Sequence, residues 1–182
     1  GLAVALRSPH VDFIVSPYSY GFRGIGGHGP AMPPSESLRL HNKLFLFEED
    51  SRACTAQDQD YGRVYTVDHS IAVLQRNMAE VVTRGQGIWW LGPHMRLDQE
   101  PSFRPVIQRF QDLGNWATTL DRRPSAEIAV LLDDESYLYE SIHNDLDLPL
   151  IFQQRLWGLP KLGAPADHYL LQDLIEGNVP PY

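Results

Sequence analysis

Residues 43–50 read Lys43-Leu44-Phe45-Leu46-Phe47-Glu48-Glu49-Asp50, and this stretch decides the fold. The near-continuous apolar run is typical of a parallel strand that is buried on both faces. Three acidic residues follow it directly, so carboxylates gather where the strand ends. In parallel α/β folds the ligand site lies at the carboxyl ends of the strands. We therefore expect the candidate site at the end of this strand.

Strands and helices alternate on either side of the stretch. Apolar runs predict strands at 11–17 and 87–92, and apolar spacing predicts helices over 68–84 and 102–120. This order predicts a parallel sheet with right-handed crossovers. Because a βα unit of about 30 residues suits a (β/α)8 barrel, we interpret residues 1–123 as the last three βα units of a TIM barrel.

The sequence also predicts a short helix, an N-cap and the buried faces of the two long helices. A short helix is expected over 35–42, after a loop rich in glycine and proline, and Asp68 is the expected N-cap of the first long helix. The expected buried faces of the two long helices comprise Ile71, Leu74, Met78, Val81 and Val82 in the first, and Val106, Ile107, Phe110, Leu113 and Trp116 in the second.

A second domain is expected from residue 124 onward. The polar segment 121–125 interrupts the pattern, which then restarts with an apolar strand over 127–134. A helix around 148–159 and a strand over 168–171 complete a β-α-β unit. Residues 124–182 therefore resemble the opening of a doubly wound α/β domain.

Composition limits the function. The 182 residues carry a formal net charge of −8, which disfavours nucleic acid and anionic membranes as partners and suits a neutral or cationic small ligand. Cys54 is the single cysteine, so an intrachain disulfide or a cysteine-based metal site is excluded. No apolar run approaches the ~18 residues of a membrane span. The first residues predict no signal peptide, and we expect both ends to be cut from a longer chain.

Glu48 is the candidate catalytic residue whose direction is best defined by the sequence. Side chains alternate along a strand, so Glu48 shares a face with the leucines and Glu49 shares one with the phenylalanines. The phenylalanines suit a helix-covered exterior and the leucines a barrel interior, which points Glu48 into the mouth of the barrel. The alternative is a salt bridge from Glu48 to Arg52 or Lys43.

Aromatic residues supply further candidates. Tyr18 or Tyr20 could donate a hydrogen bond to Glu48 and keep it ionised, or both could pack beneath the glycine-rich segment. Trp89 and Trp90 are adjacent, so one should face inward as a platform for a sugar ring while the other packs in the core.

Charged neighbours of Glu48 are candidates as well. Asp50 lies at the same strand end and is expected among the substrate-binding residues. Arg52 and Arg23 either order the acidic cluster or bind sugar hydroxyls, although most such arginines are paired surface residues. Glu49 is not expected to take part.

Several motifs are rejected. Residues 24–29 satisfy G-x-G-x-x-G, but the prolines that follow forbid the helix that a nucleotide site needs. The seven histidines are scattered without a metal-binding spacing, so neither a metal nor another cofactor is expected. The acidic residues 133–135 are interpreted as a solvated loop and helix cap.

The motifs SPYSY (16–20), ESLRLHNKLFLFEEDSR (36–52), GIWWLG (87–92) and EIAVLLDDES (127–136) occur in a particular order and spacing. In both respects the chain resembles the C-terminal part of the catalytic barrel of family 42 glycoside hydrolases, the β-galactosidase group, joined to the start of their flavodoxin-like, glutamine amidotransferase-like trimerisation domain. The resemblance covers nearly the whole chain. It implies that 11–17, 43–48 and 87–92 correspond to barrel strands six, seven and eight.

The resemblance implies a retaining hydrolase that acts on a carbohydrate without a cofactor and forms a homotrimer at full length. It assigns the nucleophile to Glu48, places the acid/base residue upstream of residue 1, and so implies that the isolated fragment is inactive. Residues 41–43 read His-Asn-Lys where close relatives would have His-Gly-Lys. The sugar, the linkage and the cellular location stay open.

A hypothesis from another functional class also stays open. In it the chain is a non-catalytic α/β binding or assembly module, and the acidic strand end is a structural salt-bridge network. The two differ in what Glu48 does: in a hydrolase it lies at the carboxyl edge of the sheet with a tyrosine and a tryptophan facing the same cavity, whereas in the module an arginine binds it and it is closed to solvent.

Overall fold

The structure is a computed structural model that describes residues 1–28, 31–121, 123, 125–141 and 157–182. The chain divides into two compact units. Unit 1 comprises Gly1–Ile14, Pro33–Phe45 and Pro124–Tyr182, and unit 2 comprises Val15–Met32 and Leu46–Arg123. One boundary between the units falls between Arg123 and Pro124, where the sequence predicts the domain boundary. Unit 1 also includes two segments that come before this boundary, Gly1–Ile14 and Pro33–Phe45. The domain limits given above stay a prediction.

A three-stranded sheet carries the candidate site. Its order is β1 (Phe13–Pro17), β2 (Leu44–Glu49) and β3 (Gly87–Trp90). Strands β2 and β3 are parallel, with Leu46 opposite Gly87 and Glu48 opposite Trp89. Unit 2 is therefore mixed α/β with parallel pairing, as expected. A barrel remains a proposal.

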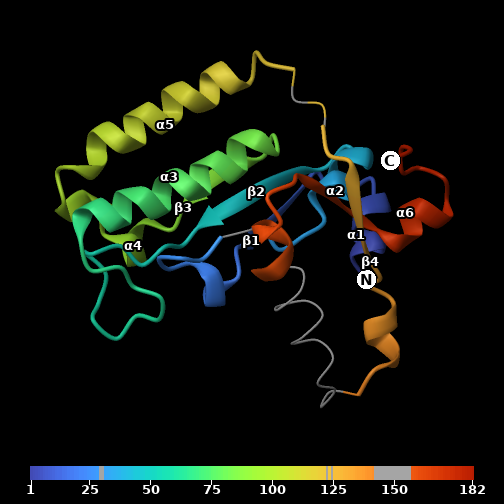
Figure 1. Cartoon of the computed structure of the whole chain (residues 1–182), viewed down its shortest axis with the longest axis horizontal. Coiled ribbons are helices and arrows are strands. Elements are labelled where there is room, and N and C mark those ends of the chain that lie inside the picture. The colour runs from blue at the N-terminus through green and yellow to red at the C-terminus, as the bar shows by residue number, and fades with distance from the viewer. Residues whose placement is uncertain (29–30, 122, 124, 142–156) are drawn as a thin grey trace. The chain divides into compact units, whose positions relative to one another are not determined.

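Two long helices cover one face of β2 and β3. Helix α3 (Val67–Thr83) and helix α5 (Phe103–Ala117) lie side by side over these strands (Figure 1). The shorter elements are η1 (Tyr20–Phe22), α4 (Gly92–Met95) and η2 (Leu97–Gln99).

The helices correct two expectations. The N-cap of α3 is Thr66, whose hydroxyl accepts a hydrogen bond from the amide of His69 at 3.2 Å, so Asp68 lies inside the first turn. In α5 the buried residues include Phe103, Phe110 and Ala117, whereas Trp116 is exposed. At 100° per residue Trp116 lies about 120° from Phe110, which takes it off the packed face.

Unit 1 contains a second parallel pair. Strands β4 (Ile128–Leu132) and β5 (Ala166–Leu170) pair in parallel through all five residues. The α-helices of this unit are α1 (Leu2–Arg7), α2 (Ser35–Leu40) and α6 (Leu171–Ile175). Two short 3-10 helices, η3 (Ser136–Tyr139) and η5 (Leu159–Lys161), also belong to it. The helix expected around 148–159 lies largely outside the described residues, and a flavodoxin-like domain stays a prediction.

Helix α2 packs on β5 through polar side chains. Ser37 accepts a hydrogen bond from the amide of Leu170 at 2.7 Å and donates one to the buried carboxylate of Asp173. Glu36 accepts from the amide of His168 at 2.6 Å, and His41 contacts Asp173 at 2.8 Å. Short polar side chains thus satisfy backbone donors of β5.

Candidate functional site

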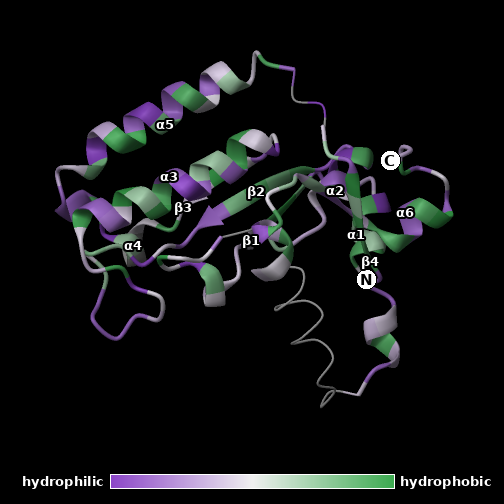
Figure 2. Cartoon of the chain, viewed as in Figure 1, coloured by the Kyte–Doolittle hydropathy of each residue, from purple (hydrophilic) through white to green (hydrophobic). Residues whose placement is uncertain are grey.

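The strand end separates its two glutamates onto opposite faces. Phe47 and Glu49 are fully buried on the side of α3, whereas Leu46 and Glu48 are half-buried on the other side. Figure 2 shows the hydrophobic β2 turning hydrophilic at its tip. The alternation expected from the sequence is confirmed, because the phenylalanine face is the one covered by a helix.

Glu48 shares its face with Trp89. The two are register partners in parallel strands, so their side chains point to the same side of the sheet. Trp89 is 37% exposed, whereas the ring of Trp90 stacks on Phe110 of α5, with centroids 6.3 Å apart and planes 4° apart. The two tryptophans therefore face opposite sides of the sheet, as expected, with Trp89 exposed and Trp90 half-buried against α5.

The side chain of Glu48 makes no hydrogen bond or ion pair with any other described residue. Lys43 donates to the carbonyl of Ser8 at 2.8 Å, and Arg52 pairs with Asp50, so the salt bridge considered for Glu48 is not formed. Burial and the negative charge of Asp50 raise the pKa of Glu48, and Arg52 opposes them. A carboxyl group whose pKa is shifted and whose oxygens have no partner among the described residues is a candidate for acid–base or nucleophilic chemistry.

Asp50 is structural rather than open to a ligand. It is 1% exposed and lies between two arginines, with Arg23 at 3.6 Å and Arg52 in direct contact. The guanidinium of Arg23 lies 4.4 Å from the ring centre of Tyr20. The expectation that Asp50 contacts a substrate is therefore corrected, and both arginines order the acidic cluster.

Tyr20 is the more exposed of the two candidate tyrosines. Its ring is 45% exposed. Burial, together with the hydrogen bond and charge of Asp50 and the charge of Glu48, raises the pKa of its phenol. Tyr20 is thus electrostatically coupled to both carboxylates, and a substrate-binding role for it stays a prediction.

Tyr18 lies behind the sheet. Its ring is 1% exposed and stacks on Phe47 at 5.2 Å. Its hydroxyl donates to Glu49 Oε1 at 3.3 Å and contacts Ser51 Oγ at 2.8 Å. The expected hydrogen bond to Glu48 is therefore wrong, because the tyrosine falls on the helix-covered face.

Glu49 anchors a buried polar network that sequence reasoning missed. Its carboxylate accepts from the amide of Ser51 at 3.0 Å and from the side-chain amide of Asn77 at 2.8 Å. Burial raises the pKa of Glu49, while the hydrogen bonds from Ser51 and Asn77 lower it. The available signal was Asn77 itself, a polar residue between Val73 and Val81 on the buried face of α3.

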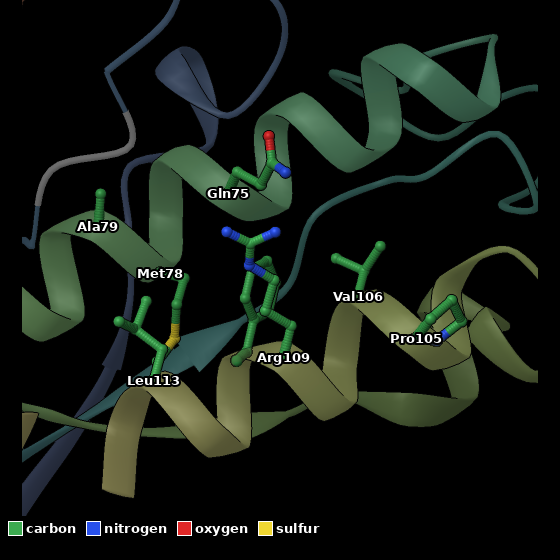
Figure 3. Close-up of a pocket in the computed structure, with 8 residues that line it drawn as sticks. Gln75, Met78, Ala79, Pro105, Val106, Arg109 and Leu113 are labelled. Atoms are coloured by element: carbon green, nitrogen blue, oxygen red, sulfur yellow. The ribbon is translucent and has the colours of Figure 1, made fainter. Parts of the chain in front are cut away.

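A groove lies between α3 and α5, on the face away from Glu48. Its volume is about 480 Å³, and Figure 3 shows side chains of both helices turned into it. The lining residues are Gln75, Met78, Ala79, Pro105, Val106, Arg109, Phe110 and Leu113. Because the sheet separates it from Glu48, the groove is not part of the candidate site.

The described residues contain no cluster of three or more histidine, cysteine or acidic side chains that could hold a metal ion. Cys54 is half-buried and has a free thiol. Among the helices of the described part of the chain, none is long and apolar enough to cross a membrane.

The comparisons with known proteins found no matching family model, curated protein or solved structure. We therefore infer function from the geometry of the strand end.

Proposed function

We propose that the chain carries the nucleophile part of a retaining, β-galactosidase-like glycoside hydrolase, with Glu48 as the nucleophile. One observation carries the proposal. Glu48 is a half-buried carboxylate at the carboxyl end of a parallel strand, without a hydrogen bond or ion pair to another described residue, beside the exposed ring of Trp89.

The chemistry would be a double displacement. A Glu48 oxygen attacks the anomeric carbon while the bond to the leaving oxygen breaks, and a second carboxylic acid gives that oxygen its proton. Water then attacks the same carbon, gives its proton to the second carboxylate and releases Glu48. The second carboxyl must lie about 5–5.5 Å from the first, and we assign it to a segment outside residues 1–182.

The neighbours of Glu48 support the assignment. Trp89 offers an apolar surface of the kind that sugar rings stack on. Burial and the charge of Asp50 raise the pKa of Glu48, and the neighbouring Arg52, which pairs with Asp50, lowers it and so favours the ionised form that attacks. Strands that present such groups at their carboxyl ends are the arrangement that a TIM barrel uses for catalysis.

A non-catalytic module is the second candidate. The burial of Glu49 and the arginine pairing of Asp50 favour it, because both acids have structural roles. A non-catalytic module does not explain Glu48, because neither the Glu49 network nor the Asp50 ion pairs include this residue. The hydrolase gives Glu48 a role and is compatible with the structural roles of Glu49 and Asp50.

The test is covalent trapping with 2,4-dinitrophenyl 2-deoxy-2-fluoro-β-galactoside on the natural polypeptide that carries this sequence. The activated leaving group removes the need for an acid, and the fluorine slows release of the glycosyl ester. We expect mass spectrometry to find one fluoroglycosyl group on Glu48, none after Glu48→Gln, and an unchanged yield after Glu127→Gln, an exposed control. A label elsewhere, or none, contradicts the proposal.

A further inference from the structure

The strand ends in two adjacent glutamates, and this creates an ambiguity that the fold must resolve. Glu48 and Glu49 have the same chemistry, and a slip of one residue exchanges the two faces of a strand. Leu46 and Phe47 would tolerate the exchange poorly, but both are apolar. A polar device that recognises one carboxylate would settle which glutamate faces out.

The buried carboxylate of Glu49 is surrounded by donors. Oε1 accepts from the amide and hydroxyl of Ser51 and from the hydroxyl of Tyr18. Oε2 accepts from Nδ2 of Asn77 at 2.8 Å. A carboxylate that accepts from three side chains and a backbone amide is held far more specifically than hydrophobic packing would hold it.

Arg76 determines which way the Asn77 amide points. Its Nε and one terminal nitrogen donate to Asn77 Oδ1 at 2.9 and 2.8 Å. A guanidinium has donors but no acceptor, so the oxygen of the amide must face Arg76 and the nitrogen must face Glu49. The pair therefore forms a donor relay aimed at one carboxylate.

Arg76 is itself fixed by the glycine-rich loop. Its terminal nitrogens donate to the carbonyls of Gly24 and Gly27, each at 2.9 Å, and of Arg23 at 3.1 Å. Arg23 in turn pairs with Asp50, so the relay connects the loop to both residues that follow Glu48.

We propose that Asn77, oriented by Arg76, is the positioning residue that holds Glu49 behind the sheet and so keeps Glu48 as the glutamate presented on the open face. This inference rests on the proposed function in that it gives Glu48 the role of nucleophile. It goes further by assigning a task to two consecutive residues of α3 that never touch the substrate.

Carboxyl footprinting with a carbodiimide and glycine ethyl ester tests the placement without requiring activity. In the wild-type chain Glu48 is expected to react and Glu49 to be protected. In Asn77→Leu the protection of Glu49 should be lost and the Glu48 to Glu49 ratio should fall. Val81→Ala is the matched control, because it truncates a buried side chain one turn along the same face of α3. An unchanged ratio in Asn77→Leu, or an equal fall in Val81→Ala, overturns the inference.

Trapping kinetics on the natural polypeptide test the consequence. A merely structural role lowers the amplitude of labelling with the fluoroglycoside, whereas a positioning role lowers the rate constant of the molecules that react, here by about 10- to 100-fold in Asn77→Leu. Absence of label on wild-type Glu48 contradicts the proposed function alone, because footprinting still decides the inference.

A charge swap gives a second variant pair should the leucine variant not fold. Asn77→Asp alone places two carboxylates together and should slow labelling. Adding Glu49→Gln restores a donor and acceptor that match, with the new aspartate accepting from Arg76 and from the new glutamine amide. Recovery of the rate constant in the double variant supports the inference, and no recovery overturns it.

Discussion

Glu48 and Trp89 are register partners in neighbouring parallel strands, and their side chains lie on the same face of the sheet. Their neighbours one residue along, Glu49 and Trp90, are also partners and lie on the opposite face. The strand end thus carries two acid–tryptophan pairs of identical composition, of which one faces the helices, with Glu49 buried and Trp90 stacked on Phe110, and one lies on the other face. This matched arrangement allows function and stability to be tested separately.

Trp89→Ala and Trp90→Ala are expected to have different effects. Trp90 stacks on Phe110, so its truncation should cost about 3–5 kcal/mol of unfolding free energy. Trp89 is 37% exposed, so its truncation should cost about 1 kcal/mol or less, while in the natural polypeptide that carries this sequence it should lower kcat/KM on an aryl β-galactoside by about tenfold. Urea unfolding and steady-state kinetics measure the two effects, and equal losses of stability would contradict the assignment of faces.

The sequence predicted these faces because alternation along a strand is a local property. The leucine and phenylalanine positions of β2 differ by one residue, and helix-covered sides favour the bulkier set. The sequence did not predict the partner of Tyr18. This residue lies beyond the end of β1, so its direction depends on the path of the chain after the strand, and it contacts Glu49, which is 31 positions away in the sequence.

Other features were beyond local reasoning for the same physical cause. Ser37 and Leu170 are 133 positions apart, and nothing in a short polar helix indicates that its side chains will satisfy the amides of a distant strand. The buried Asn77 could have been noticed, because a polar residue at the spacing of Val73 and Val81 needs a partner. The N-cap was missed because Thr66 and Asp68 both suit the role.

Asp50→Asn and Arg52→Gln should move the acid limb of the pH profile in opposite directions. Asp50 raises the pKa of Glu48 and Arg52 lowers it. The reaction needs ionised Glu48, so removing the charge of Asp50 should extend activity to lower pH, and removing that of Arg52 should shift the limb to higher pH. The measurement is kcat/KM of the natural polypeptide against pH, and a shift of both variants in one direction would contradict the electrostatics.

Asp50→Asn should lower the free energy of unfolding much more than Arg52→Gln does. It leaves the buried guanidinium of Arg23 without its carboxylate, for which we expect a loss of about 3–5 kcal/mol in unfolding free energy. Denaturant unfolding followed by tryptophan fluorescence checks this. The pH profile of Asp50→Asn is to be recorded at a temperature where the variant is folded.

Ser37→Ala should destabilise unit 1. The change leaves the amide of Leu170 and one oxygen of buried Asp173 without the serine hydroxyl, and each orphaned group costs about 1–3 kcal/mol. The exposed Ser125 supplies the control, and Ser125→Ala should remain within about 0.5 kcal/mol of wild type. Hydrogen exchange at Leu170 should speed up in the first variant and not in the second; the same exchange rate in both would show that the hydroxyl is dispensable.

The 182-residue chain by itself should not turn over an aryl β-galactoside with a poor leaving group. Retaining hydrolysis needs a second carboxyl about 5–5.5 Å from the nucleophile, on the same side of the substrate. Glu49 faces the helices, where Asn77 and Ser51 hold it, and Asp50 is buried between two arginines. Neither can protonate a leaving group above the open face. Release of phenol from phenyl β-galactoside, whose leaving group needs a proton, by the purified chain, abolished by Glu48→Gln and unaffected by Glu127→Gln, would show that a complete acid/base pair lies within these residues after all.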